Sequence, residues 1–218
     1  FSGCSSLINA IIPSGITTIY AYTFSNCTSL TNVVIPTNIT SIAAGAFKGC
    51  AGLTSITIGE NVTRIGGDAF SNCTALSEIN FNARAMENLI SYDGRFNSIG
   101  VKSEGINVKI GANVTKIPEY LFGSSSNPKI TSVEFQGTSI CKSIGKNAFA
   151  NCTYLKGIKI PNSVTYIASY AFYNCSSLAS ITIGEKVDTI GSDAFHDCVG
   201  LVEINYNAKS ISSFGSAN

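Results

Sequence analysis

The chain has 218 residues, of which 12% are charged and 44% are hydrophobic, and its formal net charge is +1. A balance this close to neutral, with lysine and arginine scattered along the chain, excludes the basic surface that attracts nucleic acids or anionic membranes. No apolar run approaches the roughly 20 residues that span a bilayer, so we expect no membrane insertion.

A period of 23 residues begins at Phe1 and predicts a repeat architecture. Each copy starts with a phenylalanine, which is followed three residues later by a cysteine and six residues later by a leucine. Copies with this pattern start at Phe1, Phe24, Phe47, Phe70, Phe149, Phe172 and Phe195. Because the chain begins inside a copy, we expect it to be a fragment of a longer protein.

Paired hydrophobic residues come next in each copy, as in Ile56 and Ile58, and a Pro or Gly such as Gly59 often ends the pair. The alternation and the β-branched side chains predict a short strand. One copy cannot bury its own hydrophobic residues, whereas stacked copies bury about six per repeat and form a parallel sheet with strands about 4.8 Å apart. We therefore expect a single array of about nine repeats over residues 1–218.

Two further hydrophobic positions, such as Val62 and Ile65, lead to the next Ala-Phe pair. Asp68 and Asp193 precede this pair and are predicted to cap a short helical or 3-10 turn on the convex side. The predicted fold is an α/β solenoid whose parallel sheet forms a concave face. A parallel β-helix is the alternative, and it requires three strands in each coil.

Residues 82–148 are less regular, because the repeat phenylalanines Phe70, Phe96 and Phe122 are spaced 26 residues apart and Phe149 follows Phe122 after 27. Insertions in solenoids usually form loops on one face. The insertion at residues 83–104 is therefore a candidate contact patch, and simple decay of the repeat is the alternative. It contains Met86, Tyr92, Asp93, Arg95 and Phe96.

The repeating unit resembles the leucine-rich repeat, and in particular its 23-residue BspA-like, or treponemal, class. The resemblance covers essentially the whole chain and rests on matching copies of the unit formed by Cys50, Leu53, Ile56, Ile58, Val62, Ile65, Ala69 and Phe70. It implies a right-handed leucine-rich-repeat superhelix. It also implies a cell-surface or secreted protein that adheres to host proteins or to other microbes.

Seven of the eight cysteines occupy one repeat position and are expected to form a single inward-facing column. Parallel Cβ vectors about 4.8 Å apart exceed the usual 3.5–4.5 Å of a disulfide, so we predict buried free thiols and no disulfide framework. Cys141 lies outside this column and is predicted to be the one reactive thiol.

No set of residues in the sequence is typical of an enzyme. His196 is the single histidine, and it occupies the repeat position of Ser71, which indicates a solvent-facing scaffold residue. We therefore predict no catalysis, no cofactor and no metal. We interpret the seven N-x-S/T sequons as duplicated turns rather than glycosylation sites; they start at Asn26, Asn38, Asn61, Asn72, Asn113, Asn151 and Asn174.

The residues between the paired strand hydrophobics form the predicted binding surface, which we call the central column. In chain order it contains Ile11, Val34, Thr57, Asn80, Lys109, Glu134, Lys159, Thr182 and Asn205. A neighbouring column contains Asn32, Ser55, Glu78, Ser132, Ser180 and Glu203. We expect Lys109, Glu134 and Lys159 to be the most sensitive to a partner, and ordinary solvated strand residues are the alternative interpretation.

The sequence thus favours a non-catalytic adhesion or recognition module that binds a protein or a glycan through the concave face or the insertion. The protein would be a host extracellular protein or another microbial surface protein. One alternative is a structural spacer that projects other domains, and another is an accessory domain of a larger surface enzyme. The last repeat has no clear cap over residues 210–218, which predicts end-to-end self-association through its edge.

Overall fold

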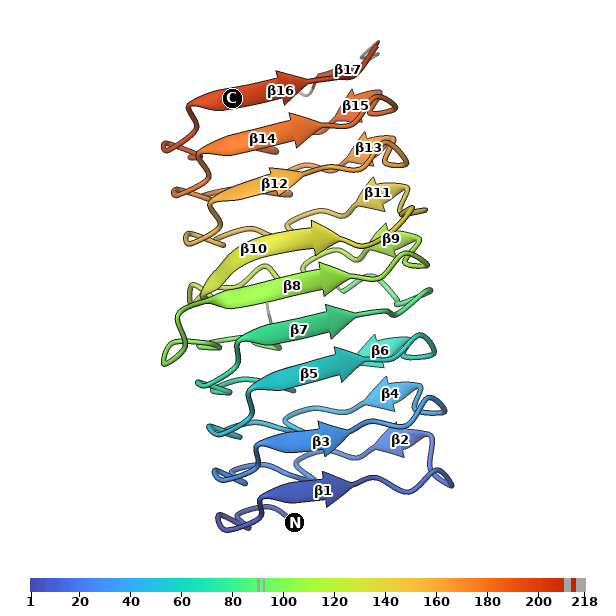
Figure 1. Ribbon diagram of the computed structural model, residues 1–218, viewed down its shortest axis with the longest axis vertical. Helices are drawn as coiled ribbons and strands as arrows, with labels where there is room; N and C mark the ends of the chain where they lie inside the picture. The colour runs from blue at the N-terminus through green and yellow to red at the C-terminus, as the bar shows by residue number, and fades with distance from the viewer. Residues whose placement is uncertain (90, 92, 210–212, 215–218) are drawn as a thin grey trace.

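The computed structural model describes residues 1–89, 91, 93–209 and 213–214, the last two by their backbone only. Successive coils of this part of the chain stack along one long axis, from the N-terminal coil at one end to the C-terminal coil at the other (Figure 1). The predicted solenoid with a parallel sheet is confirmed, but its predicted α/β class is not, because the described residues contain strands and no helix. Tyr92 and the uncapped tail at 210–212 and 215–218 lie outside the described residues.

One strand from each described coil contributes to a main stack, in which neighbouring strands that pair are parallel (Figure 1). The strands β5 to β16 of this stack form a seven-stranded sheet, and β1 and β3 form a two-stranded sheet beside it. We call the two together the main sheet. Its strands are β1 (Asn9–Ile11), β3 (Asn32–Val34), β5 (Ser55–Ile58), β7 (Glu78–Phe81), β8 (Ile106–Ile110), β10 (Ile130–Phe135), β12 (Gly157–Lys159), β14 (Ser180–Ile183) and β16 (Glu203–Tyr206).

A second, shorter strand follows the main strand in most coils (Figure 1). Three of these strands pair in one sheet: β2 (Thr18–Ile19), β4 (Ser41–Ile42) and β6 (Arg64–Ile65). Five pair in another: β9 (Lys116–Ile117), β11 (Ser143–Ile144), β13 (Tyr166–Ile167), β15 (Thr189–Ile190) and β17 (Ser213–Phe214). The described coils therefore have two strand positions and not the three that a β-helix requires.

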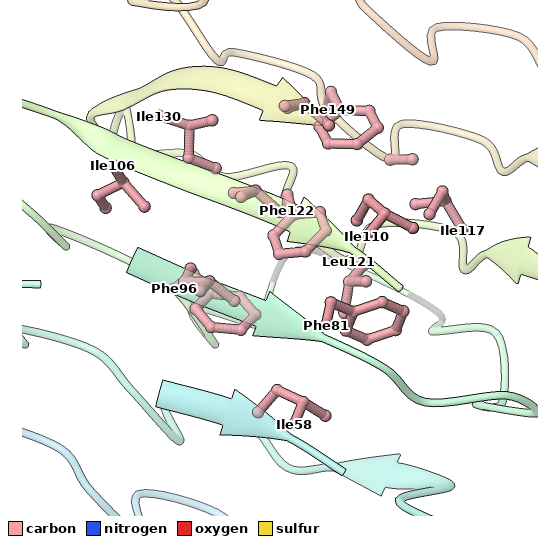
Figure 2. Close-up of a cluster of buried hydrophobic side chains, with 14 of the residues drawn as sticks. Ile58, Phe81, Phe96, Ile106, Ile110, Ile117, Leu121, Phe122, Ile130 and Phe149 are labelled. Atoms are coloured by element: carbon pink, nitrogen blue, oxygen red, sulfur yellow. The ribbon is translucent and has the colours of Figure 1, made fainter. Parts of the chain in front are cut away.

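The phenylalanines that open the repeats form one continuous stack through the core. Neighbouring rings from Phe1 to Phe195 have centroids 5.3–5.6 Å apart, and their planes lie within 16° of each other except for the tilted Phe96–Phe122 pair at 33°. In the irregular middle, the edge of Phe81 packs against Phe122 with centroids 5.9 Å apart (Figure 2). The longer middle repeats thus keep the same buried stack.

The Ala-Phe turn is not helical in the described residues, so the predicted helical or 3-10 turn was wrong. Alternate N–H groups of the turn bond across coils: Phe47 N donates to Ala69 O at 2.8 Å and Gly49 N donates to Ser71 O at 2.7 Å, while Lys48 N, between them, donates along the chain to Gly45 O at 3.1 Å. A helix would need those N–H groups for bonds within its own turn.

Backbone conformation at the same turn also rules out the predicted caps. Asp68 and Asp193 have φ angles of 57° and 55°. A helix N-cap lies in the extended region, so these aspartates are left-handed turn residues. The position two residues after the phenylalanine is left-handed as well, as in Asn72 with φ 62° and Asn174 with φ 53°. Left-handed residues flank the repeat phenylalanines on both sides from Phe24 to Phe96 and from Phe149 to Phe195, which prevents a helix from continuing there.

Five of the seven cysteines of the predicted column are buried, Cys198 in the last coil is half-buried and Cys4 in the first coil is exposed; all eight cysteines are free thiols. Every thiol of the column after Cys4 donates to the carbonyl oxygen of a phenylalanine in the preceding coil; Cys50 Sγ lies 3.1 Å from Phe24 O and Cys73 Sγ lies 3.3 Å from Phe47 O. Burial raises the pKa of the Cys50 thiol to about 12. A cysteine at this position therefore packs as a small hydrophobic residue and also satisfies a buried carbonyl group.

Cys141 is buried too, which contradicts its predicted reactivity. It occupies the repeat position of Val62, so it belongs to a second inward-facing column that also contains Ile39, Val114, Val164 and Val187. Burial raises the pKa of the Cys141 thiol to about 11, and little thiolate is present at neutral pH.

In the folded protein, iodoacetamide at mildly alkaline pH is expected to alkylate Cys4, which is exposed, and to leave Cys141 unmodified until denaturant is added. Peptide mass spectrometry over a time course measures both rates, and Cys4→Ser serves as the control that removes the fast reaction. Labelling of Cys141 as fast as Cys4 would contradict the buried position.

Candidate functional site

The central column lies on the outer face of the main sheet, because strand alternation directs Ile56 and Ile58 into the core and Thr57 outward. The strand register aligns most of the predicted members. It pairs Ile11 with Val34, Thr57 with Asn80, Asn80 with Lys109, Lys109 with Glu134, Lys159 with Thr182, and Thr182 with Asn205. The geometry brings these side chains onto one surface, and their role in binding stays a prediction.

The character of the column changes along the solenoid. At the N-terminal end it is apolar, with Ile11 89% and Val34 60% exposed. Beyond β5 the column is polar or charged up to Asn205. A partner that follows the whole column would therefore meet an apolar patch first and charged groups near the middle.

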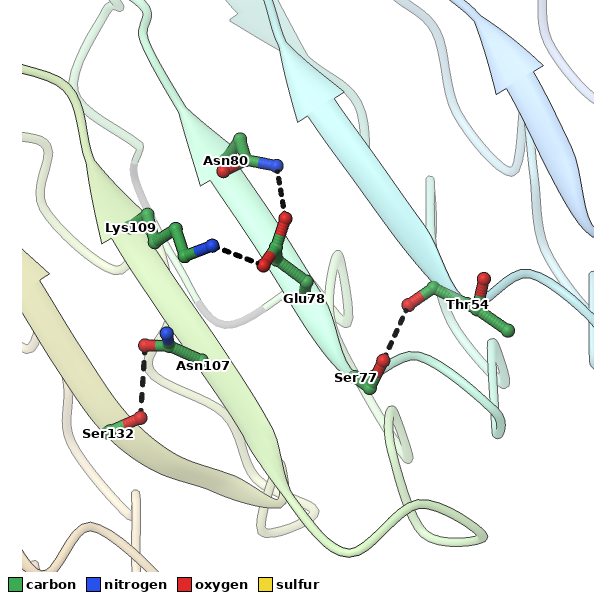
Figure 3. A network of polar contacts seen from close by, with 7 residues as sticks. All are labelled: Thr54, Ser77, Glu78, Asn80, Asn107, Lys109 and Ser132. Carbon is green, nitrogen blue, oxygen red and sulfur yellow. Dashed lines mark hydrogen bonds and ion pairs between the residues drawn. The ribbon is translucent and has the colours of Figure 1, made fainter.

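Lys109 already has a partner within the sheet (Figure 3). Its Nζ lies 2.5 Å from Glu78 Oε2, and Asn80 Nδ2 donates to Glu78 Oε1 at 2.8 Å. These two hydrogen bonds, first from Lys109 and then from Asn80, lower the pKa of the Glu78 carboxyl. The pair therefore stabilises the fold above the unfolded-state pKa of Glu78, and this contribution is lost as pH falls through the lowered pKa. A ligand has to compete with Glu78 for Lys109.

Glu134 and Lys159, in contrast, border a hollow of about 720 Å³ at the C-terminal ends of β10 and β12. We call it the β10 hollow. Its apolar lining includes Val133, Phe135, Ile140 and Pro161, and its polar lining includes Thr138, Ser139, Asn162 and Ser163. Two more lysines, Lys142 and Lys186, complete its charged rim.

The β10 hollow arises from a local insertion in the repeat. Three residues separate Ile58 from Val62 in a regular coil, whereas five residues separate Phe135 from Cys141, which occupy the same two positions. The two extra residues lengthen the loop 136–140, in which Gly137 has a φ of 57°. Several residues of this loop line the hollow. The 27-residue spacing from Phe122 to Phe149 is the signal of this site in the sequence, whereas the predicted contact patch was the earlier insertion at 83–104.

Charge in the β10 hollow is predominantly positive. Three lysine ammonium groups and one carboxylate, that of Glu134, give a formal charge of three minus one, or +2. Within the described residues, the side chains of Lys142, Lys159 and Lys186 form no ion pair and no hydrogen bond, and all three are exposed. These ammonium groups are therefore available to a ligand.

The insertion at 83–104 is divided between core and surface: of its 20 described residues, seven are buried and eight are exposed. Met86 and Phe96 are buried, and Arg95 is only 9% exposed. The Arg95 guanidinium donates to Ile65 O at 2.7 Å and pairs with Asp93. Desolvation raises the pKa of Asp93 and lowers that of Arg95. These contacts join the insertion to the preceding coil, while Val101, Lys102 and Glu104 are exposed at its C-terminal end.

His196 is exposed and stacks on Tyr173 with ring centroids 5.7 Å apart, as a scaffold residue on the surface does. The nearest carboxylates are those of Asp197 and Asp193, at 3.5 and 3.7 Å. Among residues 1–89, 91 and 93–209, no three His, Cys, Asp or Glu side chains gather closely enough to hold a metal ion. The same residues contain no helix that is long and apolar enough to cross a bilayer.

Solved structures similar to this chain are bacterial leucine-rich repeat proteins. A leucine-rich cell surface protein from Faecalibacterium prausnitzii is 28% identical, with a TM-score of 0.43, over 98% of this chain and 65% of that protein. A leucine-rich repeat protein from Eubacterium ventriosum is 26% identical, with a TM-score of 0.57, over 95% of this chain and 45% of that protein. The chain thus spans less than two thirds of the length of these relatives. No curated protein matches it.

The family model described as the BspA type leucine-rich repeat region matches residues 1–127 and 95–217, with six copies of the repeat. The two matches together cover nearly the whole chain and include the regular copies and the irregular middle. This agrees with the stacked coils, the phenylalanine stack and the cysteine column described above. The chain therefore belongs to the BspA-type leucine-rich repeat family.

Proposed function

We propose that the chain is a non-catalytic binding module of a cell-surface or secreted protein, and that it contacts a protein partner through the outer face of the main sheet. The observation that carries the proposal is the central column, a continuous surface on a rigid sheet that includes the rim of the β10 hollow. Family membership and the low share of charged residues, 12%, support the surface location. Host extracellular proteins and surface proteins of other microbes are the expected partners.

Binding is best tested with a variant that changes the face but leaves the β10 hollow intact. Thr57→Arg and Asn205→Arg add two bulky charges to exposed positions of the central column outside the hollow. Ser125→Arg and Ser177→Arg add the same charge at exposed positions outside the main-sheet strands and serve as the matched control.

Purified extracellular-matrix and plasma proteins, immobilised one at a time, are the partners for biolayer interferometry. We expect at least one of them to bind the wild-type chain, and we expect the face variant to weaken that binding at least about tenfold, the effect of losing about 1.4 kcal/mol. The control variant is expected to bind like the wild type. No binding to any protein of the panel, or equal losses in both variants, would overturn the proposal and favour a structural spacer.

A further inference from the structure

We infer that the β10 hollow binds an acidic segment of a protein partner, with an apolar side chain of that segment in the hollow and its carboxylates on the lysine rim. The inference rests on the proposed function and names the chemistry of the partner. It follows from three features of the described residues: the shape of the hollow, the state of its charged groups and the polarity of its lining.

The size and position of the hollow suit a short stretch of peptide. Its volume of about 720 Å³ falls within the range of roughly 300–1,000 Å³ that is typical of ligand pockets. It lies where the central column meets the loop 136–140, so a partner that lies on the sheet face reaches it without leaving the surface. The ends of β10 and β12, the loop 136–140 and residues 161–163 together line the hollow.

The apolar lining suits one or two apolar side chains. Ile140 is 45% exposed although its neighbours in the chain pack into the coil, and Phe135 is half-buried. Covering these groups and Pro161 would remove apolar surface from water at about 25 cal/mol per Å². A purely polar ligand would leave that surface without a partner.

The charged rim selects carboxylates. Lys142, Lys159 and Lys186 come from three different coils and have no ion-pair partner in the described part of the chain. A lysine is a flexible point charge, so three of them can reach carboxylates at differing positions along a segment. Glu134 on the same rim repels a ligand that is anionic throughout, such as a sulfated glycan, and tolerates a segment that carries charge only at its ends or on one side.

Ser163 adds a hydrogen-bonding group in the lining. Its Oγ has no hydrogen-bond partner in the described structure. A buried hydroxyl group without a partner is costly, and because this oxygen is covered by the protein, a peptide N–H or C=O group in the hollow becomes its partner only when the Ser163 side chain rotates toward the hollow. Peptide backbone carries such groups at every residue, which favours a peptide over an apolar small molecule.

The test uses fluorescein-labelled decapeptides and fluorescence anisotropy. The probe peptide contains two leucines flanked by four glutamates, one comparison peptide replaces the glutamates with lysine, and another replaces the leucines with alanine. We expect the probe to bind at ionic strengths of roughly 0.1 M, with at least tenfold weaker binding of both comparison peptides. Binding should also weaken as salt rises, because the lysines are exposed and screened.

Charge reversal locates the site. The triple variant Lys142→Glu, Lys159→Glu and Lys186→Glu is expected to weaken binding of the probe at least tenfold. Lys102→Glu, Lys146→Glu and Lys156→Glu make the same change in net charge at exposed lysines outside the hollow, and this control is expected to change binding less than twofold. Circular dichroism melts of both triples show whether they fold. Ile140→Ser tests the apolar lining and should weaken the leucine peptide but not the alanine peptide.

Several outcomes would overturn the inference: no binding of the probe at millimolar concentration, equal binding of the lysine peptide, or equal losses in both triple variants. A heparin-derived oligosaccharide that binds more tightly than the probe, and loses that binding in the hollow triple, would assign the site to an anionic glycan instead. These failures are distinct from failure of the proposed function, which the Thr57→Arg and Asn205→Arg variant tests outside the hollow.

Discussion

Replacing Phe149 with alanine is expected to lower the free energy of unfolding by about 3–5 kcal/mol. The ring is fully buried and stacks between Phe122 and Phe172, with centroids 5.4 and 5.3 Å away. Its neighbours belong to the adjacent coils, which are fixed by the backbone bonds of the turn, such as Phe149 N to Ala171 O at 2.8 Å. The coils therefore cannot collapse into the cavity, and the cost is expected near the upper end of this range. Urea denaturation followed by circular dichroism measures the change.

Tyr154→Ala is the control for this substitution. Tyr154 lies in the same coil and is 45% exposed, so its loss is expected to cost less than about 1 kcal/mol. A Phe149 variant that unfolds at the same urea concentration as the Tyr154 variant would show that the phenylalanine stack contributes little to stability.

Replacing Gly66 with alanine is expected to destabilise the fold by about 2–3 kcal/mol through overpacking. A Cβ atom at this position would lie 2.4 Å from Ala44 N and 2.8 Å from Ala43 C in the preceding coil. Both are backbone atoms, and Gly66 N donates to Ile42 O at 2.7 Å in the same place, so the two coils would have to separate to relieve the contact. Thermal unfolding measured by circular dichroism reports the loss as a lower Tm.

Gly59→Ala provides the matched control. Gly59 lies in the same coil, at the end of the main strand, and a Cβ atom there would meet nothing within 4 Å. Neither glycine has a left-handed φ, so backbone strain does not separate the two substitutions. We expect Gly59→Ala to leave Tm nearly unchanged or to raise it slightly, because alanine lowers the entropy of the unfolded chain. An equal loss in both variants would contradict close contact between the coils as the cause.

The turn around each phenylalanine shows where prediction from the sequence failed. Ala-Phe preceded by aspartate is compatible with the start of a helix when one repeat is considered alone. The stacked coils offer the N–H groups of the turn a carbonyl group in the next coil, as for Phe47 N and Ala69 O. At alternate residues of the turn, bonds between repeats thus take the place of the bonds of a helix, and residues such as Asp68 have a left-handed conformation there.

One loop explains both the burial of Cys141 and the β10 hollow, neither of which was predicted from the sequence. Counting from the phenylalanines correctly places Cys141 outside the cysteine column. It does not show that the chain, after the loop 136–140, returns to a buried position at Cys141. The same loop creates the hollow that borders Glu134 and Lys159. The repeat pattern groups Lys109 with these two residues. Lys109 differs from them because its Nζ lies 2.5 Å from Glu78 Oε2 and therefore already has an ion-pair partner.

The sequence by itself determined the repeat period, the parallel stack of strands, the inward cysteines and the order of the central column, because these depend on which residue type recurs at each position of the repeat. Only the tertiary structure decided the conformation of the turn, the burial of Cys141 and Arg95, and the position of the β10 hollow. Each of these depends on contacts between residues one coil apart, where the bonding partner or the space available is supplied by the neighbouring repeat. A pattern within one repeat carries no information about that neighbour once insertions change the spacing.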